Sequence, residues 1–138
     1  MRDPIQEVII EEFSVFDEWL DKYDYLIELS DSLPPIVAEH RTEEYAIKGC
    51  QSRVWVDAKE EDGKVFFAAD SDAIITKGII ALLIRVMNGR KPQEIVDMDL
   101  YFIDAIGLGE NLSPTRSNGL VAMIKQMKMY ALALTSKA

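Results

Sequence analysis

The stretch RVWVDAKEEDGKVFFAA (53–69) predicts a β-hairpin at the centre of the chain, because it contains two strand-like segments joined by a tight turn. Arg53–Ala58 alternates and is rich in Val and Trp, as strands are. Asp62-Gly63 is a hairpin signal, and Val65–Ala69 is expected to return as the antiparallel partner. A further short strand is expected at Glu44–Lys48, which places Cys50 in the connection between the first two strands.

The segment after this hairpin predicts a strongly apolar helix, Ala73–Met87, which ends at Asn88-Gly89. Ser71 or Asp72 is expected to cap its first turn, because both side chains accept hydrogen bonds from free helical N–H groups. A helix that is apolar on every side normally forms the buried centre of a domain. We therefore expect this helix to lie at the middle of the molecule.

The N-terminal third is expected to be helical. Pro4 suits a first helical turn, and a second helical stretch, Tyr23–Leu33, stops at Pro34-Pro35. A kink or break between the two is expected near Trp19–Lys22. The apolar face of the first stretch has spacings of three and four, at Ile5, Ile9, Phe13, Phe16, Leu20 and Tyr23.

The C-terminal third is expected to contain three more helices, of which two are short, Pro92–Asp97 and Asp99–Ile106. Ser113 is expected to cap the last one, with Pro114 at its first position. The predicted apolar face of this last helix consists of Leu120, Met123, Ile124, Met127, Ala131 and Leu134.

The order α-α-β-β-β-α-α-α-α predicts an α+β fold, with a small antiparallel three-stranded sheet packed on one face by helices. A chain of 138 residues fits one domain, and no linker or repeat divides it. We therefore expect a single domain over residues 1–138.

The charge balance excludes broad classes of partner. The net charge is -9, from 24 acidic and 15 basic residues, and nucleic-acid binders need clustered Lys and Arg that this chain lacks. The same acidity argues against an anionic membrane surface. The charged N-terminus does not fit a signal peptide, and one cysteine makes no internal disulfide, so a cytoplasmic protein is expected.

The sequence lacks the residue patterns of a metal site, a phosphate-binding loop and a dinucleotide-binding site. His40 and Cys50 alone do not make a zinc site, which needs about four ligands. No phosphate-binding glycine loop or dinucleotide fingerprint is present, so no cofactor and no metal are expected.

Cys50 is the chain's only cysteine, and two interpretations apply to it. A lone cysteine is more often an inert buried thiol than a reactive one. The context KGCQS instead indicates a turn, where functional residues concentrate. Lys48 and Arg53 are close in sequence, and cationic neighbours lower a thiol's pKa if they face it.

Arg116 is unusual because it falls in the first turn of the last predicted helix. A cation there opposes the helix dipole, at a cost of a few tenths to about 1 kcal/mol. In one interpretation, a carboxylate of this chain or of a partner pairs with Arg116 and offsets that cost. In the other, the Arg116 side chain is simply solvated.

Four segments together resemble the SufE family of sulfur-acceptor proteins. They occur in the family's order and span nearly the whole chain: WLDKYDYLIELSDSLP (19–34), IKGCQSRVW (47–55), DSDAIITKGIIALLI (70–84) and LSPTRSNGLVAMI (112–124). The resemblance implies a SufE/IscU-like fold. It also implies that Cys50 accepts persulfide sulfur from a pyridoxal-phosphate-dependent cysteine desulfurase (SufS- or Csd-like) and stimulates that enzyme.

In such proteins the sulfur then passes to an iron–sulfur cluster assembly scaffold, here a SufB-like complex. The resemblance places Gly49, Gln51 and Ser52 in the loop around the acceptor, and makes Arg116 a candidate for partner contact or loop positioning. Asp72 and Lys77 match the family's motif as supporting residues. For Asp72 the alternative is a helix cap, and for Lys77 it is a surface ion pair.

Two other functions remain open. One is a stand-alone thiol-dependent sulfurtransferase or peroxidase, although these enzymes usually have an anion-binding loop or a resolving cysteine, and neither is found here. The other is an interaction module in which Cys50 is incidental. The expected protein is a partner-dependent carrier rather than a self-contained enzyme.

Overall fold

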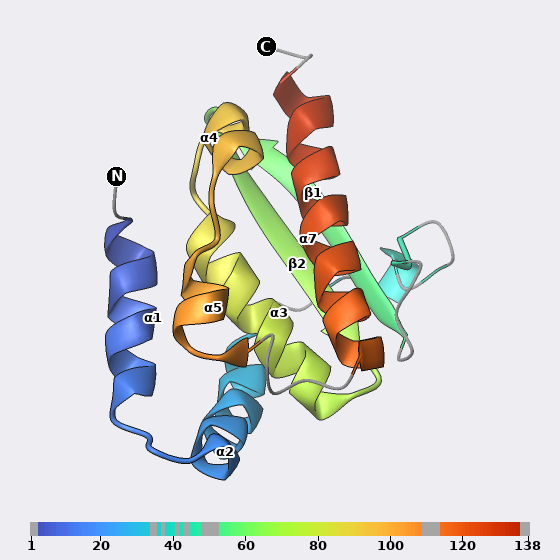
Figure 1. Cartoon of the computed structure of the whole chain (residues 1–138). Helices are drawn as coiled ribbons and strands as arrows, with labels where there is room; N and C mark the ends of the chain where they lie inside the picture. The colour runs from blue at the N-terminus through green and yellow to red at the C-terminus, as the bar shows by residue number, and fades with distance from the viewer. Residues whose placement is uncertain are drawn as a thin grey trace.

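The computed structural model describes residues 3–33, 36, 38–40, 42, 45–47, 53–108 and 114–135 (Figure 1). For His40 and residues 114–118 it describes the backbone only. These parts form an α+β fold in which helices cover one face of an antiparallel hairpin.

The hairpin consists of β1 (Val54–Glu61) and β2 (Lys64–Ser71), paired in register from Val54 opposite Ser71 to Glu61 opposite Lys64. Asp62 and Gly63 form the turn with φ of 54° and 78°, so both have the left-handed backbone that two-residue hairpins require. Side chains alternate across the strands, and the inward row is buried against the helices: Val54, Val56, Val65, Phe67 and Ala69.

Helix α3 (Ile74–Met87) lies across this face at the centre of the molecule (Figure 1). Ten of its 14 residues are buried, which confirms the prediction made from its apolar sequence. It ends where Gly89 adopts a φ of 78°, and the Gly89 N–H donates to the carbonyl of Val65 in β2.

Helices α1 (Pro4–Ser14) and α2 (Trp19–Leu29) pack on the other side of α3 (Figure 1). The break between them, at residues 15–18, precedes the expected position. The rings of Phe13 and Phe16 both pack on Tyr25, with centroids 5.1 and 5.4 Å from it, which folds α1 back on α2. The 3₁₀ turn Ser30–Ser32 extends α2, and a second lies at Ala38–His40.

Polar contacts fix α1 to the segment after α3. The carboxylate of Asp3 lies 2.6 Å from the guanidinium of Arg90. The buried Gln6 amide donates to the carbonyl of Asp99 at 3.0 Å and accepts from the N–H of Phe102 at 3.1 Å. These bonds satisfy a buried amide that would otherwise destabilise the fold.

The C-terminal third contains α4 (Pro92–Asp97), α5 (Phe102–Ala105) and α7 (Pro114–Thr135). Helix α4 has the predicted bounds, and α5 is shorter than the predicted Asp99–Ile106. The α7 helix begins at Pro114 as expected, and its predicted apolar face is buried or half-buried beside β1 and α4. The proposed cap, Ser113, lies outside the described residues.

The expectation of three strands needs correction, since the described residues contain two. The third is reduced to one antiparallel bridge between Ala46 and Trp55. The Tyr45 N–H, just before this bridge, donates to the Thr42 carbonyl at 3.1 Å, and the ends of the predicted strand, Glu44 and Lys48, lie outside the described residues. None of the described helices combines the length and apolarity needed to cross a membrane.

Candidate functional site

The sequence points to the cysteine segment, residues 48–52, and the structure describes both of its flanks. Cys50, Gly49, Gln51 and Ser52 themselves lie outside the described residues, as does Lys48. The expected placement of the acceptor and its loop therefore remains a prediction. The flanks show what holds the two ends of this segment.

The N-terminal flank pairs with the first residues of β1. The Ile47 N–H donates to the Val54 carbonyl at 2.9 Å, and the Val56 N–H donates to the Tyr45 carbonyl at 3.1 Å. The side chain of Ile47 is buried in the main core, so both backbone and side chain anchor this flank. The chain thus enters the cysteine segment from a fixed point beside β1.

The C-terminal flank is Arg53, whose backbone is held by the end of β2. The Arg53 N–H donates to Oδ1 of Asp72 at 3.0 Å, and the Asp72 N–H donates back to the Arg53 carbonyl at 3.2 Å. The Ser71 hydroxyl donates to the same carbonyl at 2.7 Å. Three hydrogen bonds therefore fix the residue that directly follows Ser52.

These contacts correct the expected role of Ser71 and Asp72 as helix caps. The N-cap of α3 is Ala73, and neither side chain caps it in the usual way. Ser71 is still part of β2, so its hydroxyl and the Asp72 carboxylate reach across to the neighbouring strand. The Ser71 oxygen also accepts from the Ala73 N–H at 3.2 Å, which links the strand end to the helix start.

Lys77 lies one turn into α3, and its ammonium is 3.3 Å from the Asp70 carboxylate. This is the ion-pair alternative that the sequence left open. The two side chains are 37% and 15% exposed, so the pair is half-buried rather than solvated. Asp70 lies opposite Trp55 on the outer face of the hairpin, one residue before the Ser71–Asp72 pair.

Arg116 lies in the first turn of α7, as predicted, and its side chain is outside the described residues. The structure therefore brings Asp72 to Arg53, the C-terminal flank of the cysteine segment, and places Lys77 beside the same end of β2. The role of Arg116 stays a prediction.

The clear pKa shifts fall elsewhere among the described groups. A bidentate hydrogen bond from Arg85, at 2.6 and 2.9 Å, lowers the pKa of the Glu12 carboxyl despite partial burial. Burial, followed by its 2.6 Å hydrogen bond to Glu12, raises the pKa of the Tyr25 hydroxyl. Burial also raises the pKa of Tyr101, which hydrogen-bonds Glu7. These groups join helices and do not flank the cysteine segment.

Sequence reasoning missed two residues of the flanks, Ile47 as a core anchor and Ser71 as a backbone clamp. The signal for Ser71 was present, since a polar residue at the inward position of a strand must find a hydrogen-bond partner. Within the described part of the chain, no group of three His, Cys, Asp or Glu residues is arranged to hold a metal ion.

Comparison with known proteins adds to this geometry. The sequence model for the SufE family, described as an Fe-S metabolism associated domain, matches residues 7–131. An uncharacterized SufE-like protein from Rhizobium etli is 40% identical over 128 residues, which cover 89% of this chain and 86% of that protein.

The fold also resembles the solution structure of a hypothetical protein from Thermus thermophilus. The TM-score is 0.80 at 24% identity, with 99% of each chain covered, so this likeness concerns the fold alone. The family model and the R. etli relative both include the cysteine segment and its flanks, and they confirm the resemblance given by the four sequence segments. The chain belongs to the SufE family, whose domain is associated with Fe–S metabolism.

Proposed function

We propose that this protein is a sulfur acceptor in which Cys50 receives sulfane sulfur from a pyridoxal-phosphate-dependent cysteine desulfurase. The observation that carries the proposal is that the SufE family match spans residues 7–131 and includes the only cysteine of the chain. A covalent sulfur carrier needs a thiol, and no other residue of this chain can supply one.

The transfer step is a thiol exchange that needs no oxidant. The Cys50 thiolate attacks the outer sulfur of the desulfurase persulfide, and a new S–S bond forms on Cys50. The S–S bond of the desulfurase breaks, and its electron pair stays on the desulfurase cysteine as a thiolate. The rate depends on the fraction of Cys50 that is ionised and on its access to the partner.

The flanks support this role because they hold both ends of the cysteine segment on one rigid hairpin. Ile47 bonds to Val54 on one side, and Arg53 bonds to Asp72 on the other. Asp72 therefore acts as a positioning residue for the segment, and Gly49, Gln51 and Ser52 are proposed to shape the loop around the sulfur. Arg116 is proposed to contact the partner or the loop.

A SufS- or Csd-like desulfurase fits as donor, and a SufB-like scaffold fits as recipient. On this account the protein stimulates the desulfurase by removing its product sulfur, and it works in the cytoplasm without a cofactor of its own. Delivery of sulfur from Cys50 to the scaffold is tested separately, by reconstituting the transfer with a SufB-like complex.

The test is to incubate the protein with a cysteine desulfurase and cysteine, and then to measure peptide masses. The Cys50 peptide is expected to gain one sulfur atom, and desulfurase turnover is expected to rise. Cys50→Ser should show neither effect. Undiminished stimulation by Cys50→Ser would instead indicate a pure interaction module, while turnover of thiosulfate or peroxide without a partner would indicate a stand-alone enzyme.

A further inference from the structure

A surface groove lies between α7 and the segment that contains α5. It has a volume of about 440 Å³. Its apolar lining comes from two places in the chain, Leu100 and Ile103 on one side and Leu120 and Ile124 on the other. We name it the α5–α7 groove.

The apolar lining reaches solvent at Val121. This side chain is 64% exposed, although it lies next to the buried Leu120 on the same helix. Val121, Ile124 and Lys128 line one wall, because residues three and four apart share a helix face. Val121 therefore extends the apolar lining of the groove to the protein surface, where the side chain of a partner can contact it.

The charges around the groove are acidic. Asp99 and Asp104 line it, both are exposed, and no ion pair is found for either among the described residues. The lysine of the lining, Lys128, donates its ammonium to the Met98 carbonyl at 2.5 Å. The lysine ammonium is therefore held by a backbone carbonyl, and no ion pair between it and either aspartate is found among the described residues.

The groove suits a protein side chain better than a small molecule. Small-molecule sites usually combine apolar walls with a few inward polar groups that fix the ligand's orientation. Here both aspartates are exposed, and the lysine is occupied by Met98. An apolar centre with a charged rim is the arrangement of a protein interface.

We propose that the α5–α7 groove binds a protein segment that carries an aliphatic side chain flanked by Lys or Arg. The aliphatic side chain fills the space between Ile103 and Ile124, and the cations meet Asp99 and Asp104. Complementary charge of this kind guides association and excludes acidic partners from the groove.

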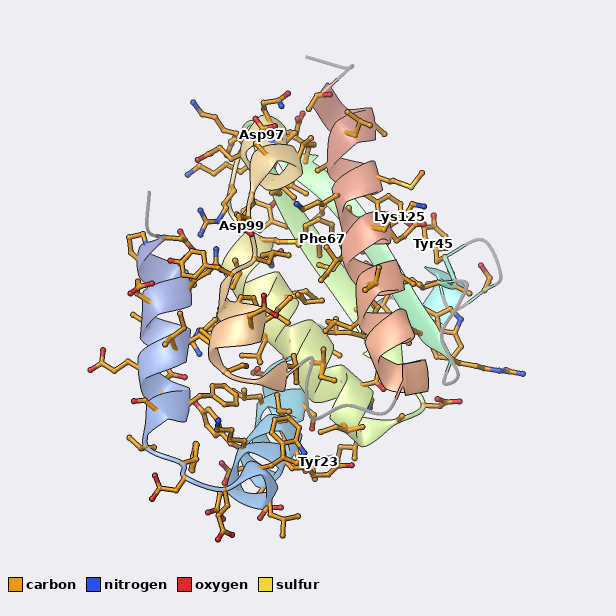
Figure 2. The ribbon with its side chains drawn as sticks, viewed as in Figure 1. Tyr23, Tyr45, Phe67, Asp97, Asp99 and Lys125 are labelled. Atoms are coloured by element: carbon orange, nitrogen blue, oxygen red, sulfur yellow. The ribbon has the colours of Figure 1, made fainter. Side chains whose placement is uncertain are left out.

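This site is separate from the proposed sulfur chemistry. Figure 2 shows Asp97 and Asp99 on one side of α7, and Tyr45 and Lys125 on the other. Tyr45 belongs to the N-terminal flank of the cysteine segment, so in this view α7 lies between that flank and Asp99 of the groove. The groove uses no residue of the cysteine segment, and the proposal is that binding there does not depend on Cys50.

The test is a titration of the ¹⁵N-labelled full chain with a synthetic helical peptide that has Leu on one face and Lys on both flanks. At physiological salt we expect saturable shifts in the amide signals of residues 98–104 and 119–128. Two matched peptides, with Ala for Leu and with Glu for Lys, should not produce them. The Cys50→Ser protein should bind the Leu–Lys peptide with the same affinity, which keeps this test independent of sulfur transfer.

Two double variants, each of which removes two negative charges, test whether binding depends on the charges at the groove. Asp99→Asn with Asp104→Asn should weaken peptide binding about fivefold, as expected for two exposed ion pairs. Asp21→Asn with Glu28→Gln on α2 should leave it unchanged. The proposal is overturned if the Ala–Lys peptide binds equally well, if shifts spread over α2 and the hairpin, or if no saturable shift appears. Concentration-dependent shifts in the same residues without peptide would also overturn it, in favour of a second copy of this chain.

Discussion

Helices α3 and α7 are the two long helices that lie against the hairpin, and they differ in how much of their surface is covered. Helix α3 is enclosed by β2 on one side and by α2 on the other, and most of its residues are buried. Helix α7 buries one face only, and leaves Val121, Met129 and Leu132 more than half exposed. Helix α3 therefore contributes mainly to stability, whereas α7 leaves apolar side chains exposed at the surface.

The same contrast applies to the expected chemistry. The flanks of the cysteine segment are hydrogen-bonded to the hairpin against which α3 packs. The α5–α7 groove lies on the exposed helix. Substitutions around α3 should therefore change the free energy of unfolding, whereas substitutions on the exposed face of α7 should leave it almost unchanged.

The largest effect is expected for Gly78→Ala in α3. A Cβ atom at this position would lie 2.0 Å from the carbonyl oxygen of Leu26 in α2, so the two helix backbones would have to separate. Overpacking against backbone has few ways to relax, and we expect a loss of more than about 3 kcal/mol in the free energy of unfolding. Urea denaturation measures it, with Thr76→Ala as the control expected to stay close to wild type.

A matched pair of leucines tests the contrast between the two helices directly. Leu82 in α3 is 1% exposed, and Leu132 in α7 is 56% exposed. Leu82→Ala should reduce the free energy of unfolding by about 3 kcal/mol, because it leaves a cavity in the core. Leu132→Ala should change it by less than about 0.5 kcal/mol. Equal losses would show that α7 is covered by something that the described residues do not include.

A smaller effect is expected from the polar contact that joins α1 and α2 to α3. Arg85 lowers the pKa of Glu12 below its ordinary value of 4.5, so the ion pair stabilises the fold above that pH. The stabilisation is lost as the pH falls through the lower, folded-state pKa. Glu12→Gln should reduce the free energy of unfolding by about 1 kcal/mol at pH 7.

The difference between Glu12→Gln and wild type should disappear in acid, once Glu12 is protonated in both folded and unfolded chains. Denaturation curves across the acidic range measure this. A difference that stays constant with pH would mean that the substitution acts through packing and not through the ion pair.

The most local effect is expected at Asp72, where one hydrogen bond is lost at the end of β2. Asp72→Ala removes the acceptor for the Arg53 N–H, while Asp72→Asn keeps a carbonyl oxygen in its place. A lost hydrogen bond of about 1 kcal/mol should accelerate hydrogen exchange at the Arg53 amide about fivefold in the Ala variant. The Asn variant should remain near wild type, and equal exchange in both variants would contradict the role of Asp72 as a clamp.

Local signals in the sequence predicted much of the fold. Asp62-Gly63 between two strand-like segments predicted the hairpin, and Pro92 at a first helical position predicted the start of α4. The features that sequence could not place depend on distant partners. Asp72 looked like a helix cap because its partner, Arg53, lies 19 positions earlier in the chain.

The break between α1 and α2 is set in the same way by Phe13 and Phe16 packing on Tyr25, a contact between distant residues that the sequence does not show. Gly78 belongs to one of the four segments that match the SufE family. The reason for a glycine there is its close packing against α2, which is visible only in the fold. For the site, the sequence predicted Cys50 and showed the four segments that match the family, while the hydrogen bonds to Arg53 became visible only in the fold.

The most direct test of the sulfur-acceptor proposal is a single-turnover transfer from a desulfurase loaded with persulfide and freed of cysteine. Intact masses of both proteins are followed after mixing. We predict that one sulfur atom appears on this chain as one disappears from the desulfurase, and that Cys50→Ser abolishes the gain. A desulfurase that keeps its sulfur in the presence of the wild-type protein, or a gain that persists in Cys50→Ser, would contradict the proposal.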